Sequence, residues 1–344
     1  TVTADGTLFR GSIFAGSGND DITAEAAFSA AVLRGGSGND TIDVMARLDG
    51  TSTLDKSTVN GNDNNDLITA VVLTGSDSSF IAGGKGKDTV NLTFSGANAF
   101  TINGGAGHDD VDLSASGPLS SFVISLGAGK DSINFSAGAA AGLTSNANID
   151  GGALGDLFVF GDNTDVSFVA GSATIAGGDG ADTILFSAGL DLNEGFVLGG
   201  AGTDSVKISA AFDGGTVNGG AGADTVTLGT YAASGSNGGY IQGGAGADRI
   251  ELGSVSSNAL YSGRSYTTGG STVGYASFDE SNLDGLDFVS AGFTVATGNA
   301  TNNVELFTIS QDVVTAVAEN SIKNPATFTA TNGLATFTST FDNT

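Results

Sequence analysis

The chain has 344 residues, of which 56 are Gly, 2 are Pro and none is Cys, so neither a collagen helix nor a disulfide or thiolate zinc site can form. Its formal net charge of -26, from 37 acidic residues against 11 Lys plus Arg, disfavours nucleic acid and anionic membranes as partners. A hydrophobic fraction of 40% argues against disorder, and no apolar run of about 18 residues suggests a transmembrane segment.

A six-residue block that ends in Asp recurs along most of the chain. The first copy is AGSGND, the last two are GGAGAD, and neighbouring copies lie about 23 residues apart. Self-similarity at such a period indicates a stack of equivalent coils. The terminal residues of the eleven copies are Asp20, Asp40, Asp66, Asp88, Asp109, Asp131, Asp156, Asp182, Asp204, Asp224 and Asp248.

Apolar residues flank every block at a spacing of two. Two columns follow the Asp, beginning with Ile22 and Ala24 in the first copy, and a third column precedes the block by two residues, beginning with Ile13. Alternating apolar residues, many of them β-branched, predict strands with one buried face. Each coil therefore supplies one strand after its block and one before the next block. Equivalent strands should stack at about 4.8 Å.

These patterns predict an all-β fold: a right-handed parallel β-solenoid of about eleven coils over residues 1–252, with a C-terminal β cap or assembly region over residues 253–344. The second region alternates again at FTVAT from Phe293, at VELFTI from Val304 and on both sides of Asn332–Gly333. Asn-Gly between alternating strands predicts a hairpin. The turn opposite the block varies in length and composition, which is typical of a solenoid edge that is free to bind or to drift.

The block contains the residue types that calcium requires. Glycine at the first, second and fourth positions permits positive φ, so the backbone can curl and direct carbonyl oxygens at one point, and the final Asp adds a carboxylate. Calcium takes six to eight oxygen ligands, more than one turn offers, so each ion should lie between two stacked turns. We expect up to about ten Ca2+ in one row, with folding coupled to the metal. The predicted ligands are the eleven Asp residues above and Gly35, Gly83, Gly104, Gly177, Gly199, Gly219 and Gly243.

Three blocks depart clearly from the pattern. Asn62 and Asn64 replace glycines, a mild change because Asn tolerates the left-handed conformation. Leu126 replaces the first glycine of LGAGKD, and Leu154 occupies the fourth position of GGALGD, where its side chain should distort the curl. The sites beside Asp156 are therefore expected to be the weakest.

The blocks, each followed by x-apolar-x-apolar, resemble the nonapeptide GGxGxDxUx of the repeats-in-toxin (RTX) hemolysin-type family over about two-thirds of the chain. The resemblance implies that turn carbonyls and Asp carboxylates bind calcium between successive coils. A coil of that family usually carries two such turns in about 18 residues. Here one turn per coil carries the block, so we expect one calcium row. The resemblance also implies a bacterial protein that is secreted unfolded and folds in external calcium.

Few other residues offer catalytic chemistry. His108, the single histidine, lies at the fifth position of GGAGHD and should face outward, and without Cys neither a catalytic triad nor a multi-His zinc site is expected. The cluster of Asp279, Glu280, Asp284 and Asp287 could form an extra calcium site or a glycosidase pair, although a solvated turn is the simpler interpretation. We predict no catalytic residues.

The sequence therefore favours an extracellular, calcium-dependent structural protein of a bacterial cell surface, such as a surface-layer, matrix or filament component. Its expected partners are calcium ions and either other copies of itself or a cell-surface polysaccharide. Two alternatives remain open. The chain could be an adhesin or glycan-binding module whose variable turns recognise the ligand, or the non-catalytic tail of a secreted enzyme.

Overall fold

A computed structural model describes most of the repeat region and parts of the remainder. The described residues are 1–5, 8–25, 28–44, 54–72, 78–94, 97–115, 119–137, 147–161, 166–167, 173–187, 190–231, 240–246, 248–255, 266–268, 271–273, 277–278, 288–291, 327–331 and 334–338. All their regular secondary structure is β-strand. In this part of the chain there is no helix with the length and apolar character needed to cross a membrane.

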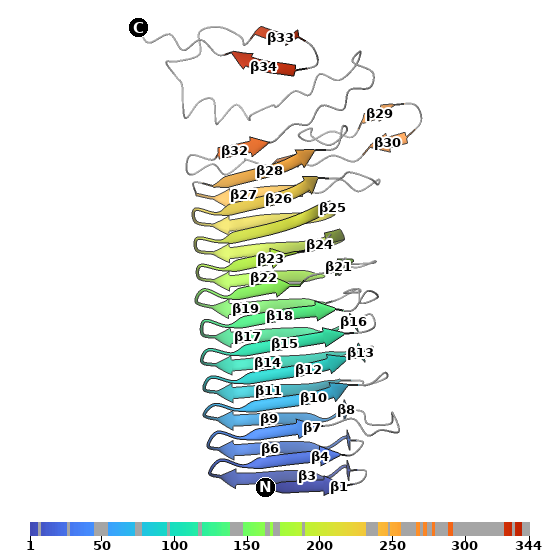
Figure 1. Ribbon diagram of the computed structural model, residues 1–344, viewed down its shortest axis with the longest axis vertical. Helices are drawn as coiled ribbons and strands as arrows, with labels where there is room; N and C mark the ends of the chain where they lie inside the picture. Colours follow the sequence, from blue (N-terminus) through green and yellow to red (C-terminus); the bar gives the residue numbers. More distant parts are fainter. Residues whose placement is uncertain are drawn as a thin grey trace.

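The strands form two parallel ladders that extend along a stack of coils (Figure 1). Strands that follow the Asp blocks make the first ladder and strands that lead into the blocks make the second. The first ladder contains β1 (Val2–Asp5), β4 (Asp21–Glu25), β7 (Thr41–Val44), β10 (Leu67–Val72), β12 (Thr89–Phe94), β15 (Asp110–Ala115), β18 (Ser132–Ala137), β20 (Leu157–Phe160), β23 (Thr183–Phe186), the start of β25 (Ser205–Ala221), β26 (Thr225–Tyr231), β28 (Arg249–Val255) and β32 (Phe288–Ala291). The second contains β3 (Ser12–Ser17), β6 (Val32–Ser37), β9 (Thr58–Asp63), β11 (Ser79–Lys85), β14 (Phe100–Ala106), β17 (Val123–Ala128), β19 (Asn148–Ala153), β22 (Thr174–Asp179), β24 (Leu190–Ala201), the end of β25, β27 (Tyr240–Ala245) and β31 (Ser277–Phe278).

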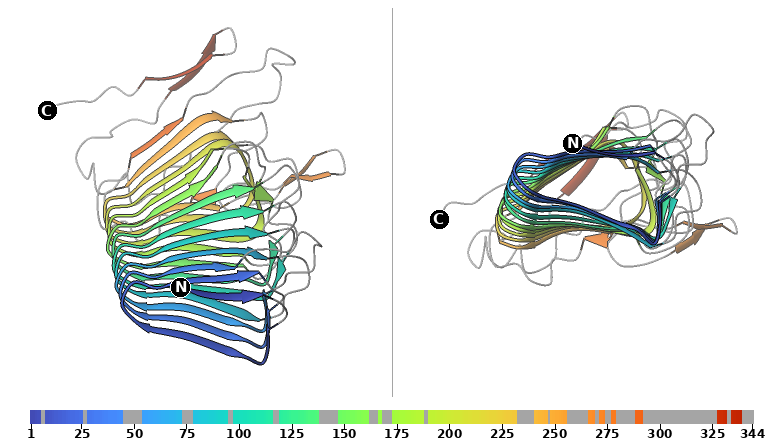
Figure 2. Two further views of the ribbon diagram at one scale, coloured as in Figure 1. Left: turned by 60° about the horizontal axis from the view of Figure 1, so that its bottom comes forward. Right: turned by 90° about the horizontal axis from the view of Figure 1, so that it is seen from below.

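Viewed along the stack, the coils superimpose as a closed outline whose two long sides are the ladders (Figure 2). Short parallel strands lie between these sides: β2 (Leu8–Phe9), β5 (Phe28–Ser29) and β8 (Leu54–Asp55) form one sheet, β13 (Ala97–Asn98) pairs with β16 (Leu119–Ser120), and β21 (Val166–Ser167) pairs with β24. The predicted all-β parallel β-solenoid is confirmed. Its register places each Asp block directly above the previous one.

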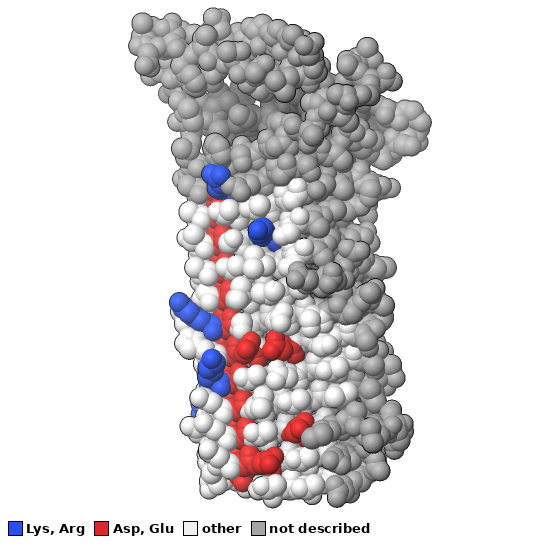
Figure 3. All heavy atoms as spheres, in the orientation of Figure 1, with Lys and Arg blue, Asp and Glu red and all other residues white. Residues whose placement is uncertain are grey.

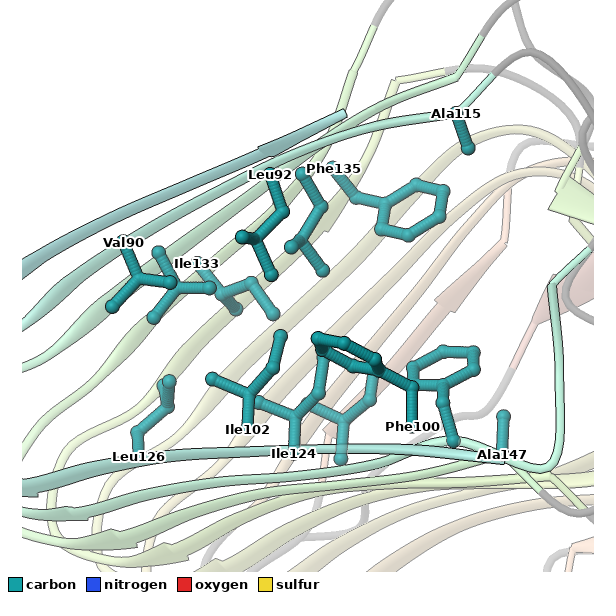
Figure 4. Close-up of a cluster of buried hydrophobic side chains, with 14 of the residues drawn as sticks. Val90, Leu92, Phe100, Ile102, Ala115, Ile124, Leu126, Ile133, Phe135 and Ala147 are labelled. Atoms are coloured by element: carbon teal, nitrogen blue, oxygen red, sulfur yellow. The ribbon is translucent and has the colours of Figure 1, made fainter. Parts of the chain in front are cut away.

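The interior is filled by the three predicted apolar columns. Every column residue whose burial is described is buried, except Ile13, which is partly buried. Figure 4 shows Val90, Leu92 and Ile133 of the first ladder facing Ile102 and Ile124 of the second. Larger rings replace aliphatic residues further along, where Phe160 and Phe186 stack with ring centroids 4.5 Å apart. The turns are thus held in register by a continuous apolar core.

The edge opposite the Asp blocks is more regular than its sequence suggests. At equivalent corners, each just before a strand of the second ladder, a residue other than glycine adopts a φ between 48 and 59°. This conformation costs an L-residue about 1–2 kcal/mol, so the stacking around each corner must offset the cost. The corner residues are Arg10, Ala30, Lys56, Ser78, Ala99 and Ser121.

Both ladders continue beyond Leu252, through β31 and β32. Further on, β33 (Thr327–Thr331) and β34 (Leu334–Thr338) form the antiparallel hairpin predicted around Asn332–Gly333. Another antiparallel pair joins β29 (Tyr266–Thr268) and β30 (Ser271–Val273). The segments FTVAT and VELFTI and the acidic cluster at 279–287 lie outside the described residues. The division at residue 252 and the capping role stay predictions.

Candidate metal centre

The eleven block Asp side chains are connected by a single chain of hydrogen bonds. The backbone N–H of each Asp donates to Oδ1 of the Asp one coil further on, with N to O distances between 2.7 and 2.9 Å from Asp20 to Asp248. The residue that follows each Asp donates its N–H to the backbone carbonyl of the block Asp in the previous coil. Thr41, for example, donates to the carbonyl of Asp20 at 2.8 Å. The carboxylates therefore form an aligned row, which is visible as an acidic stripe along the stack (Figure 3).

These carboxylates are enclosed by the turns, and half of their oxygens have no hydrogen-bond donor. From Asp40 to Asp248 each block Asp is at most 3% exposed. In the nine side chains from Asp40 to Asp224, Oδ1 accepts the amide described above, whereas Oδ2 is buried without a hydrogen-bond partner. A buried acceptor left unsatisfied costs about 1–3 kcal/mol, and more when it carries charge. The row therefore presents unsatisfied oxygens that a cation could bind.

Burial raises the pKa of the carboxyl groups from Asp66 to Asp224 in this row. Desolvation is the largest cause and, together with neighbouring Asp side chains, raises the pKa of Asp66, Asp109 and Asp156 to about 7, although each accepts a backbone hydrogen bond that lowers it. The same effects raise the pKa of Asp182 and Asp224 to about 6. The charged row is thus electrostatically unfavourable without a counter-ion.

The turn glycines serve two purposes, which corrects the prediction that all three of them supply positive φ. The second position has positive φ in all eleven blocks, and the fourth position has it in all but one. In the block that begins at Gly83, for example, φ is 121° at Gly84 and 134° at Gly86. The first-position glycines do not adopt positive φ. They serve another purpose, because a Cβ built there would lie less than 3 Å from the Asp side chain of the same block.

The first-position glycines leave a space that two oxygens enter. A Cβ built on Gly83 would lie 2.6 Å from Oδ2 of Asp88 and 2.7 Å from the carbonyl oxygen of Gly104 in the next coil. Gly104, Gly177, Gly199 and Gly219 show the same arrangement with their own Asp and the next first-position carbonyl. A space bordered by a carboxylate oxygen without a donor and a backbone carbonyl fits the oxygen-only ligand preference of calcium.

The predicted ligands therefore come together in pairs of adjacent turns. The seven named glycines, Gly35, Gly83, Gly104, Gly177, Gly199, Gly219 and Gly243, are all buried beside the Asp row. Among the described residues, no three His, Cys, Asp or Glu side chains form a cluster that could hold a metal. An ion between two turns would therefore need backbone carbonyls as well as carboxylates.

A second, outer set of hydrogen bonds connects the fifth positions of neighbouring blocks, and sequence reasoning missed it. The side-chain oxygen of Asn19 accepts the backbone N–H of Asn39 at 2.9 Å, and Asn65 accepts that of Lys87 at 2.7 Å. His108 is exposed, as predicted, and its Nδ1 accepts the N–H of Lys130 at 2.8 Å. The recurrence of Asn at this position in the first three blocks was the available signal.

Two of the three divergent blocks keep the turn geometry. Asn62 and Asn64 adopt φ of 84° and 78°, as Asn tolerates. Leu154 adopts a φ of 77° with its side chain 55% exposed, and Asp156 still accepts and donates in the ladder. The expected distortion at Leu154 is therefore wrong, because the leucine takes on the strained conformation and the turn does not change.

A family match agrees with this geometry. The family described as "RTX calcium-binding nonapeptide repeat (4 copies)" matches residues 31–45, 170–192, 215–230 and 235–254, each of which contains one complete block. The chain carries RTX calcium-binding repeats. No curated protein and no solved structure matched in the two other comparisons.

The RTX repeats imply that this chain binds calcium, and the solenoid they build is a non-catalytic repeat fold. The suspected family resemblance is confirmed. The oxygen atoms available to such an ion are the buried Oδ2 atoms and the carbonyls beside them.

Proposed function

We propose that this chain is an extracellular structural rod of a bacterial cell surface, stiffened by a row of calcium ions between its stacked turns. One observation carries the proposal: nine aligned, buried carboxylates, from Asp40 to Asp224, each keep one oxygen without a hydrogen-bond donor. A metal-free row of this kind is costly, since like charges are held one coil apart, about 4.8 Å, in a desolvated setting. Calcium would convert the same row into a cross-link between coils.

The proposed ligands are the block Asp carboxylates together with the turn carbonyls that border the same space. Calcium accepts irregular arrangements of oxygen ligands, which suits sites assembled from two turns. Bound only by the folded stack, the metal would stabilise it by mass action. External calcium would therefore favour the folded rod, and the low calcium of the cytosol would leave the chain free to be exported. RTX repeats are typical of secreted bacterial proteins, which supports this location.

The shape of the solenoid supports a structural role. In the described part of the chain, the two ladders form a long, regular rod with a continuous apolar core (Figure 1). We infer a surface-layer, matrix or filament component that associates with other copies of itself or with a cell-surface polysaccharide. Electron microscopy with and without calcium tests this: ordered sheets or fibres support it, and monodisperse rods contradict it in favour of a binding module.

Circular dichroism during a calcium titration tests the metal dependence. The β signal should rise cooperatively with calcium, and Asp204→Ala and Asp224→Ala should weaken the response. Asp179→Ala is the matched control, because it removes an exposed carboxylate from the third position of a turn in the same row. A β signal that is independent of calcium, or an equal effect of Asp179→Ala, would contradict the proposal.

A further inference from the structure

One turn in the middle of the row lacks the space that the other turns share. In most blocks the first residue is glycine, and the place of its missing Cβ is bordered by Oδ2 of its own Asp and by the first-position carbonyl of the next coil. In the turn that ends at Asp131 this residue is Leu126. Ladder register is unchanged on both sides of it: Ser125 pairs with Asn103 and with Asp150. The Cβ of Leu126 therefore occupies the equivalent point.

The side chain of Leu126 is completely buried and belongs to the apolar core. Figure 4 shows it pointing between the two ladders, near the turn end of the core. The same turn differs at its fourth position, where Gly129 is outside the positive-φ range that Gly107 and Gly180 adopt at 138° and 139°. Two departures thus coincide in one turn, although its Asp131 remains in the hydrogen-bonded ladder.

We propose that Leu126 closes the gap between the turns of Asp131 and Asp156 to calcium, so that the row of metal sites is divided into two segments. This inference rests on the proposed calcium function. An apolar side chain at the point where carboxylate and carbonyl oxygens approach in the other turns removes room for an ion and supplies no ligand. Oδ2 of Asp131 stays buried without a partner beside it.

The segments follow from the positions of glycine. The N-terminal segment extends from the turn of Asp40 to that of Asp131, and the C-terminal segment from the turn of Asp156 to that of Asp248. By the same argument, Ala15 at the first position of the block ending at Asp20 closes the gap at the N-terminal end. Each segment then holds four glycine-bordered gaps, and a solenoid couples each coil only to its neighbours. The two calcium rows are therefore separated by one step, at Leu126, that is joined by the Asp131–Asp156 hydrogen bond and holds no ion.

Calcium stoichiometry of the full chain tests the division. Equilibrium dialysis followed by atomic emission should show one more bound ion per chain for Leu126→Gly than for Leu126→Ala. Both variants lose the leucine packing, but only glycine lacks the Cβ that closes the gap. Conversely, Gly199→Ala places a Cβ against Oδ2 of Asp204 and the Gly219 carbonyl, and it should lose one ion relative to the wild type.

Equal stoichiometry in Leu126→Gly and Leu126→Ala would overturn the division. If the Leu126 variants do not fold, Gly199→Ala decides the matter alone, because unchanged stoichiometry there would show that the first-position space does not hold the ion. A wild-type chain that binds no calcium would instead contradict the proposed function itself. A loss of one ion in Gly199→Ala together with a gain in Leu126→Gly supports both.

Discussion

Replacing Asp109 by Asn separates the cost of the buried charge from the benefit of the metal. Asn keeps an oxygen to accept the N–H of Asp88, a bond of 2.9 Å, and removes the charge from a side chain that is 2% exposed. The rise in the pKa of Asp109 from 3.8 to about 7 corresponds to a charge penalty of about 4 kcal/mol, at about 1.4 kcal/mol per unit of pKa. The buried amide nitrogen that Asn introduces gives back about 1–3 kcal/mol if it stays without an acceptor. At pH 8 the Asp109 carboxyl, with its pKa raised to about 7 by burial, is mostly charged. We therefore expect Asp109→Asn to stabilise the metal-free rod by about 1–3 kcal/mol.

In calcium the effect of Asp109→Asn should reverse. The carboxylate faces the gaps to the turns of Asp88 and Asp131, so its loss weakens up to two proposed sites. At free calcium a hundredfold above the dissociation constant, each site contributes about 2.7 kcal/mol. The stabilisation that calcium adds, measured as the difference between unfolding free energies with calcium and with chelator, should fall by about 2.7 kcal/mol for each ion lost.

The measurement is denaturant unfolding followed by far-ultraviolet circular dichroism. Where the metal-free chain is unfolded, titration with trimethylamine oxide restores a measurable transition, since this osmolyte favours burial. Asp112→Asn is the control, because it removes the same charge from the neighbouring strand β15, away from the turn. The reasoning fails if Asp109→Asn destabilises the metal-free rod, or if calcium adds as much stability to it as to Asp112→Asn.

Three further outcomes follow from particular residues. Leu154→Gly should raise the free energy of unfolding by about 0.5–1 kcal/mol, and with it the urea midpoint. Removing a leucine from the left-handed conformation gains about 1–2 kcal/mol, and the greater chain entropy of glycine costs about 0.5–1 kcal/mol. An unchanged midpoint would show that the turn is unstrained. Phe160→Ala should cost about 3–5 kcal/mol in thermal unfolding, because it removes the ring stacked on Phe186; a loss below about 1 kcal/mol would mean that the core collapses into the space. In calcium-free buffer the melting temperature should fall as pH rises from about 4 to 7, since the pKa of Asp66 and Asp109 is raised to about 7 in the folded state, which then holds more protons than the unfolded chain; a melting temperature that rises over this range would contradict the buried, charged row.

The two ladders and their core could be predicted from the sequence because both depend on periodicity. The columns headed by Ile22 and Ala24 repeat with the blocks, and a parallel stack is the arrangement that buries all of them together. The hairpin of β33 and β34 was predictable for a local reason, the Asn-Gly turn between alternating residues. In each case the signal lies within one repeat or one turn.

Features that depend on contacts between coils gave no such signal. Nothing in the composition of the corners marks Arg10 or Lys56 for positive φ, because the corner conformation depends on contacts with a stacked coil, as when the N–H of Arg10 donates to the carbonyl of Ser29. The same holds for the Asp side chains, whose Oδ1 atoms accept amides from the preceding coil. Alignment of the blocks predicts that the carboxylates lie in a row, but only the three-dimensional register shows that half of their oxygens are satisfied by protein and half are left for a cation.

Glycine itself illustrates why residue type alone cannot rank the divergent blocks. At the second and fourth positions glycine provides a backbone conformation, so Asn62, Asn64 and Leu154 can replace it at the cost of local strain while the turn remains the same. At the first position glycine provides empty space beside a carboxylate, and any side chain fills that space whatever its φ. In the sequence, Leu154 is the more disruptive substitution, because it places a side chain at a position where glycine permits positive φ. Leu126 is the one expected to change the chemistry, because it adds an apolar group at the place where the oxygens of two coils approach each other.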